Sequence, residues 1–182
     1  VILFLRSWRL TAIILLSIPL SILAALIGLF YTGDTINAMT LGGLALAVGI
    51  LIDQSIVVIE NIMRHARQGE SATEAAINGT REVALPIFVS TLTFILVFYP
   101  IVFLSGIARF LFTPLALAVT FAVVASFLVA IFFVPVCAAK LLAAKGAPDQ
   151  EKDDEGWLHP VIEWYGRLLK KTLRFKWVTL LV

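Results

Sequence analysis

Asp53 lies inside a stretch of 25 residues, Thr35–Ile59, that carries no other charge. About 20 apolar residues at ~1.5 Å rise each are enough to cross a bilayer as a helix. A charged side chain at that depth costs roughly 2.5–3.5 kcal/mol on insertion scales, so such a group is paired, protonated or used. Asp53 is therefore the first candidate for chemistry, and the chemistry it suggests is the uptake and release of a proton or a cation.

Helical spacing places Asp53 on a stripe whose other members are mostly small. This Asp53 stripe consists of Gly42, Ala45, Gly49, Asp53, Val57 and Glu60. Small residues let membrane helices approach closely, so we expect Asp53 to face a neighbouring helix and not lipid. Apolar surroundings disfavour an ionised carboxylate and a cationic neighbour favours it, so a change in helix packing would load and release a proton.

Two further polar residues accompany Asp53. Gln54 follows it directly and cannot titrate, and Glu60 lies two turns, or ~10 Å, further along the helix, where it is a weak relay candidate. The alternative is a structural role, in which Asp53 only hydrogen-bonds to a neighbouring helix, for example to Ser90, Thr91 or Thr93.

The composition is that of a membrane protein. Of 182 residues, 60% are hydrophobic and only 14% are charged, and the mean hydropathy is +1.00. The net charge of +2 gives no reason to expect nucleic acid as a partner. The one cysteine, Cys137, excludes an internal disulfide and a multi-cysteine metal site. With no nucleophile–base pair, phosphate loop or metal motif, we expect neither an enzyme nor a bound cofactor or metal.

Four uncharged or nearly uncharged stretches are long enough to cross a bilayer, and they predict an all-α membrane protein. They are Leu10–Gly33, Thr35–Ile59, Val83–Ala108 and Phe110–Ala139. Continuous apolar runs favour helices over a barrel. Partial spans at the two ends, Val1–Leu5 and Trp177–Val182, predict that the chain is an internal piece of a longer protein.

The flanking basic residues predict the orientation. From the N-terminal flank onward, the segments that alternate with the four spans hold 2, 0, 3, 1 and 8 Lys or Arg residues, which puts 13 of 14 on one side. The positive-inside rule makes that side cytoplasmic, and with it the loops 60–82 and 140–176.

The segment between the second and third spans, Glu60–Glu82, is predicted to be a cytoplasmic helical connector. Gly69 breaks it, and Ser71 followed by Glu74 forms a capping-box pattern that opens a short helix through about Arg81. We assign no chemistry to this connector. His65, which has no second His or Cys nearby, is predicted to be a solvated surface residue.

The remaining segments complete the predicted domain organisation. Residues 1–142 form the transmembrane bundle, residues 143–156 a polar linker, and residues 174–182 the start of a further span. Residues 157–173 repeat apolar side chains at helical spacing, with basic and aromatic residues between them. This pattern predicts a helix on the cytoplasmic membrane surface, the alternative being a helix packed on a soluble partner.

The run GGLALAVGILIDQSIVVIENIMRH (Gly42–His65) resembles the fourth transmembrane helix of resistance-nodulation-division (RND) efflux pumps. FLRSWRLTAIILLSIPLSIL (Phe4–Leu23) is similar to the stretch through the third helix of that family, and PIVFLSGIARFLFTPLALAVTFAVVAS (Pro100–Ser126) to its connection between the fifth and sixth helices. The resemblance covers nearly the whole chain in order, and it places the chain between the end of helix two and the start of helix seven.

The resemblance implies a trimeric antiporter of the bacterial inner membrane, driven by the proton-motive force and working with a periplasmic adaptor and an outer-membrane channel. Asp53 matches the first acidic position of the family's relay, and Gln54 stands where drug pumps carry a second Asp. The sequence from the third to the sixth helix resembles the hydrophobe/amphiphile branch of the family more than the other branches. The alternatives are heavy-metal export, export of lipid or protein by a relative in the superfamily, and a scaffold that transports nothing.

Overall fold

The computed structural model describes residues 8–145 and 164–167. Its elements in chain order are α2 (Trp8–Thr32), α3 (Ala38–Arg67), α4 (Ala72–Phe98), the 3₁₀ turn η1 (Tyr99–Phe103), α5 (Gly106–Leu128), the π-helical turn η2 (Val129–Phe133) and α6 (Val134–Lys145). No strand occurs among the described residues. The chain divides into two compact units, Val1–Ala147 and Pro148–Val182, so residues 164–167 belong to a different unit from the helices above.

Residues close in sequence determine where the helices begin and end. Asn37 caps α3, because its side-chain oxygen accepts hydrogen bonds from the backbone amides of Met39 (2.9 Å) and Thr40 (3.0 Å). Gly33 after α2 and Gly69 after α3 have φ angles of +79° and +91°, a left-handed conformation that a residue without a Cβ adopts at little cost. The predicted break at Gly69 is therefore confirmed.

The predicted capping box of Ser71 and Glu74 is also confirmed, since the Ser71 hydroxyl accepts from the Glu74 amide and the Glu74 side chain accepts from the Ser71 amide. The predicted end of this helix near Arg81 is wrong. The connector helix and the third span form one helix, α4, because no glycine lies between Arg81 and the end of α4 and the helix accommodates Pro86 in its interior.

The fourth predicted span is likewise part of a longer helix. α5, η2 and α6 follow one another without a break, so Phe110–Ala139 lies within one helical stretch, Gly106–Ala144. The π-helical turn η2 comes just before Pro135, which has no amide hydrogen to donate. The extra residue of a π turn lets the chain pass this proline without ending the helix.

Four helical stretches are long and apolar enough to cross a membrane, which confirms the prediction of an all-α membrane protein. They are Trp8–Thr32, Ala38–Arg67, Ala72–Ile101 and Gly106–Ala144. α3 has 30 residues and is therefore about 45 Å long, against a hydrocarbon thickness of ~30 Å. Its last two turns, which follow the apolar stretch ending at Ile59, are therefore not needed to cross a layer of that thickness.

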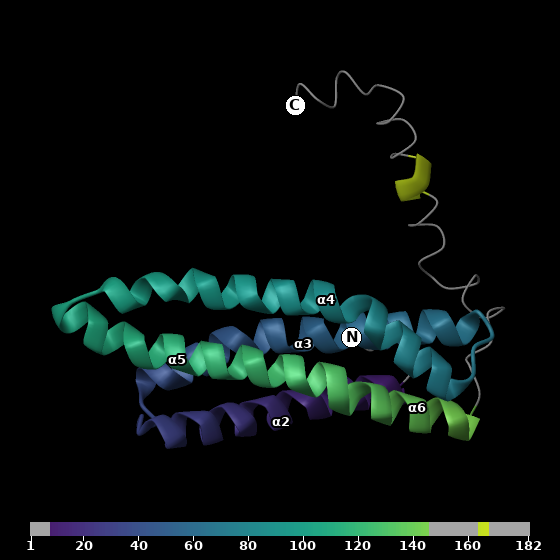
Figure 1. Cartoon of the computed structure of the whole chain (residues 1–182), viewed down its shortest axis with the longest axis horizontal. Coiled ribbons are helices and arrows are strands. Elements are labelled where there is room, and N and C mark those ends of the chain that lie inside the picture. The colour runs from purple at the N-terminus through teal and green to yellow at the C-terminus, as the bar shows by residue number, and fades with distance from the viewer. Residues whose placement is uncertain (1–7, 146–163, 168–182) are drawn as a thin grey trace. The chain divides into compact units, whose positions relative to one another are not determined.

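The helices of residues 8–145 lie side by side, and α3 is at the centre of the bundle (Figure 1). α3 packs most extensively on α5, and also on α4 and α2. Figure 1 shows the α2–α3 loop and the α4–α5 connection at the same end of the bundle, and the α3–α4 connection at the other. α3 thus has neighbours from three directions.

Two apolar clusters, separated along the bundle, form the core. The first is built around Ile14, Val58, Ile62 and Val134 and lies toward the α3–α4 connection. The second is built around Ala25, Leu29, Leu44, Ala47 and Ala118 and lies toward the α2–α3 loop. Between the clusters, buried Ser, Thr and Gln side chains replace the apolar ones.

Several predictions fall wholly or partly outside the described residues. They are the partial spans Val1–Leu5 and Trp177–Val182, the linker beyond Lys145, and most of the surface helix predicted over residues 157–173. Of that predicted helix the structure describes residues 164–167, which are helical, with Trp164 and Tyr165 exposed.

Candidate functional site

The Asp53 stripe forms one continuous exposed face of α3. All six of its residues, from Gly42 to Glu60, are exposed in the bundle of residues 8–145. Asp53 makes no hydrogen bond or ion pair with any described residue. Because all six residues are exposed, the prediction that they share one face of α3 is confirmed. The expectation that the stripe packs on a neighbouring helix is not met by α2, α4 or α5, which all lie on other sides of α3.

A layer of hydrogen bonds joins α3 to its three neighbours at the level of Asp53. We call the side chains of Ser17, Gln54, Ser55, Thr91 and Ser126 the polar layer. Ser17 and Ser55 link α2 to α3 through their hydroxyls, 2.9 Å apart. The Gln54 amide nitrogen donates to the Thr91 hydroxyl of α4 at 3.0 Å. The Ser126 hydroxyl of α5 donates to the carbonyl oxygen of Leu51 at 3.3 Å.

Hydrogen-bond chemistry determines how Gln54 is oriented in this layer. The Thr91 hydroxyl donates its hydrogen to the backbone carbonyl of Ile87 at 2.8 Å, so it can only accept from Gln54. The amide nitrogen of Gln54 must therefore face Thr91. Its oxygen, Oε1, is buried and has no hydrogen-bond partner among the described residues. Within the polar layer, the contact between α3 and α4 is thus a single hydrogen bond.

The structural alternative for Asp53 is wrong with respect to its proposed partners. Thr91 is bonded to Gln54 and not to Asp53. The Ser90 hydroxyl donates to the carbonyl of Ile87 (2.9 Å), and the Thr93 hydroxyl donates to the carbonyl of Val89 (2.9 Å), both within their own helix. The sequence-based prediction included the correct hydroxyl, that of Thr91, among its three candidates but paired it with the wrong one of two adjacent residues, because it did not fix the rotation of α3.

A second group of polar side chains lies at the C-terminal end of α3, where the chain turns into α4. We call it the elbow cluster, and it consists of Asn61, Arg64, His65, Glu70, Asn78 and Glu82. The His65 ring contacts a carboxylate through each nitrogen: Nδ1 lies 2.8 Å from Glu70 and Nε2 lies 3.0 Å from Glu82. Arg64 forms an ion pair with Glu82. Asn61 donates to the carbonyl oxygen of Gly79 at 2.7 Å.

The elbow cluster corrects the prediction that His65 is a solvated surface residue. The side chain of His65 is only 16% exposed, because it lies between Glu70 of the loop and Glu82 of α4. Both ring nitrogens can donate to carboxylates only when the ring is an imidazolium. No group of His, Cys, Asp or Glu within the described ranges could hold a metal ion, so the cluster is a hydrogen-bond network. The signal available in the sequence was a glutamate five residues after the histidine.

The elbow cluster makes the stability of the α3–α4 connection depend on pH. Hydrogen bonds to Glu70 and Glu82 raise the pKa of His65 above 6.5. The hydrogen bond from His65 holds the pKa of Glu70 below its ordinary value of 4.5, and a second hydrogen bond, from Asn78, also lowers that pKa. The His65 contribution is complete below pH 6.5 and is lost as pH rises through the raised pKa. The Glu70 contribution is complete above pH 4.5 and is lost as pH falls through the lowered pKa.

We therefore expect the connection to open more readily at pH 8 than at pH 6, a pair of values on either side of the ordinary histidine pKa of ~6.5. The measurement is amide hydrogen exchange across residues 66–75 of the full-length protein, corrected for the intrinsic effect of pH. His65→Gln, which cannot titrate, should remove the difference between the two pH values. An equal difference in His65→Gln would show that the histidine is not responsible.

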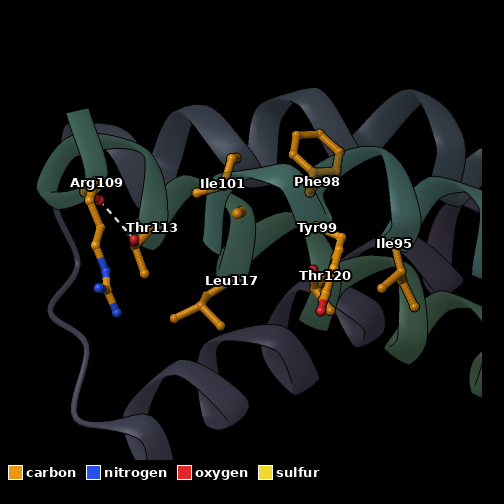
Figure 2. Close-up of a pocket in the computed structure, with 9 residues that line it drawn as sticks. Ile95, Phe98, Tyr99, Ile101, Arg109, Thr113, Leu117 and Thr120 are labelled. Carbon is orange, nitrogen blue, oxygen red and sulfur yellow. Dashed lines mark hydrogen bonds between the residues drawn. The ribbon is translucent and has the colours of Figure 1, made fainter. Parts of the chain in front are cut away.

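A small cavity lies between the end of α4 and the first turns of α5 (Figure 2). Its volume is about 210 Å³. Drug-sized ligands generally need about 300–1,000 Å³, so this cavity by itself is too small for such a compound. Figure 2 shows Arg109 at one end of the cavity, with Tyr99 and Thr120 toward the other. The Thr113 hydroxyl donates to the backbone carbonyl of Arg109 at 2.7 Å, so this hydrogen bond does not involve the Arg109 side chain.

Bilayer-length helices packed around a central helix, with one acid inside the apolar stretch of that helix, define a multi-pass helical membrane protein. The chain belongs to the AcrB/AcrD/AcrF family, whose sequence profile matches residues 1–182. The resemblance to RND efflux pumps is thereby confirmed.

Similar proteins come from several bacteria. The chain is 34% identical to the multidrug resistance protein MdtC of Pectobacterium atrosepticum and 38% identical to the swarming motility protein SwrC of Bacillus subtilis, in both cases over its whole length. It is 40% identical over 81% of its length to an uncharacterised transporter of Haemophilus influenzae. The chain spans only 18% of the first two proteins and 14% of the third. The three names describe a multidrug resistance protein, a swarming motility protein and a transporter, and none of them names an enzyme.

Proposed function

We propose that the chain is part of the proton-conducting membrane domain of a proton-driven antiporter that exports hydrophobic or amphiphilic compounds from bacteria. The observation that carries the proposal is the position of Asp53, which is exposed on the small-residue face of a central helix and is the one acid within its apolar stretch Thr35–Ile59. Only a titratable group can gain and lose a proton there, and Gln54 cannot. The description of MdtC as a multidrug resistance protein supports the class of substrate.

The proposal extends to the setting in which the protein works. Family membership supports a homotrimer in the inner membrane that cooperates with a periplasmic adaptor and an outer-membrane channel. The distribution of Lys and Arg supports a cytoplasmic position for the elbow cluster and for the segment 140–176. Glu60, which is exposed on the same stripe, is a weak candidate to pass protons between Asp53 and that side, because its place at the end of the apolar stretch also suits an interfacial anchor.

The proposal is tested with the full-length protein reconstituted in vesicles that contain a lipophilic fluorescent dye. An imposed pH gradient should drive dye movement against its concentration gradient, and a protonophore should stop it. Vesicles without protein are the control for passive leakage. Dye movement that continues at the same rate after the gradient is collapsed would show that export is not coupled to protons.

A further inference from the structure

The polar layer determines which way α3 is turned at the level of Asp53. Within about one helical turn, α3 is bonded to α5 at Leu51, to α4 at Gln54 and to α2 at Ser55. Successive residues of a helix are rotated by about 100°, so Asp53 is directed at the side that remains. The open direction of Asp53 is thus a consequence of bonds that its neighbours make to three other helices.

Among these bonds, the one between Gln54 and Thr91 depends most on the chemistry of the side chain. The Thr91 hydroxyl hydrogen is committed to Ile87, and its oxygen can therefore accept only from a donor. An amide provides that donor at any pH. A carboxylate at position 54 would instead compete with Ile87 for the same hydrogen. The pairing with Thr91 thus requires a hydrogen-bond donor at the residue next to the acid.

We propose that Gln54 is a positioning residue for Asp53: through Thr91 it holds α3 in the rotational setting that directs the carboxyl group of Asp53 to the open face. This inference rests on the proposed relay function of Asp53. The contact involves one hydrogen bond, and Gln54 Oε1 has no partner among the described residues. A small rotation of α3 can therefore break and re-form the contact, as a helix that moves during a transport cycle requires.

The proposal is tested on the pH profile of gradient-driven dye transport by the full-length protein in vesicles. Gln54→Leu and Thr91→Val each remove one side of the bond. Without it, α3 can turn Asp53 toward apolar side chains, which disfavour the ionised carboxylate, so the midpoint of the profile should move to higher pH. We expect a shift of at least about 0.5 pH unit, well within the spread of carboxyl titrations in folded proteins.

Two variants of α4 serve as controls. Thr91→Ser keeps a hydroxyl at the same place and should retain the wild-type midpoint. Thr93→Val makes the same chemical change as Thr91→Val two residues away, at a hydroxyl that bonds only within α4, and should leave the midpoint unchanged. Because Gln54 and Thr91 act through one bond, the double variant should shift the midpoint no further than either single variant.

The possible outcomes separate the two proposals. If Gln54→Leu and Thr91→Val lower the rate equally at every pH without moving the midpoint, the bond is structural and the positioning role is wrong. An equal shift in Thr93→Val would overturn it as well. If Gln54→Leu fails to assemble, the midpoint of Thr91→Val alone decides between these outcomes, because valine is nearly isosteric with threonine. Gradient-driven transport that survives in Asp53→Asn would defeat the relay function itself, whatever the midpoints show.

Discussion

Asp53→Asn is expected to reduce proton-coupled export by the full-length protein to the level of vesicles without protein. Asparagine has nearly the same size as aspartate and is also polar, but it does not bind and release a proton at any pH near neutrality. Since Asp53 makes no hydrogen bond or ion pair among the described residues, its replacement leaves the packing of α2 to α6 unchanged. The loss should therefore appear in transport and not in the yield or oligomeric state of the purified protein.

Two comparisons make the Asp53 experiment specific. Asp53→Glu keeps a titratable group on the same face of α3 and should retain part of the activity. Glu60→Gln neutralises the other acid of the Asp53 stripe, two turns further along, and should have a smaller effect because Glu60 lies at the end of the apolar stretch. Dye export that follows the pH gradient as well in Asp53→Asn as in the wild type would exclude Asp53 as the proton carrier.

Gly79→Ala is expected to destabilise the junction of α3 and α4 strongly for so small a change. A Cβ atom on Gly79 would lie 2.8 Å from Ile62 Cα and 2.9 Å from its backbone nitrogen. Backbone atoms cannot move aside as the end of a flexible side chain can. Overpacking of this kind costs about 1–3 kcal/mol, which exceeds the ~0.5–1 kcal/mol that alanine gains over glycine in a helix. The hydrogen bond from Asn61 to the Gly79 carbonyl would be displaced as well.

The measurement is the thermal unfolding midpoint of the full-length protein in detergent. The matched control is Gly42→Ala on α3, where an added Cβ meets no described atom within 4 Å, so the packing of these helices should not change. Gly43→Ala, at the next residue, would bring its Cβ within 2.6 Å of the Leu115 carbonyl oxygen and should behave like Gly79→Ala. Equal midpoints for Gly79→Ala and Gly42→Ala would contradict the close approach of α3 and α4.

Predictions based on contacts between nearby residues were largely confirmed. The four long helices follow from apolar length, and the start of α4 follows from the capping box of Ser71 and Glu74. The end of the connector helix near Arg81 was wrong because a change from polar to apolar side chains alters the surroundings of a helix without interrupting its backbone hydrogen bonds. Composition marks where a helix enters the apolar layer and does not mark where the helix ends.

The candidate site was predicted in part. The sequence identified Asp53, the stripe to which it belongs and the hydroxyls of α4. It could not show that Thr91 pairs with Gln54, because the two adjacent residues of α3 differ only by a rotation of about 100° and both are polar. Nor could it show that His65 lies between Glu70 and Glu82, since the second of these contacts depends on how α4 folds back on α3.

The amino-acid sequence by itself determined that this protein is a helical membrane protein, that its family is that of RND pumps, and that Asp53 is its exceptional residue. These properties depend on apolar length, local caps and side-chain type, which are set by residues near one another in the chain. Only the tertiary structure decided that Asp53 faces the open side and Gln54 the interior. That choice is made by Ser17, Thr91 and Ser126, which lie on other helices and fix the rotation of α3 through hydrogen bonds across the bundle.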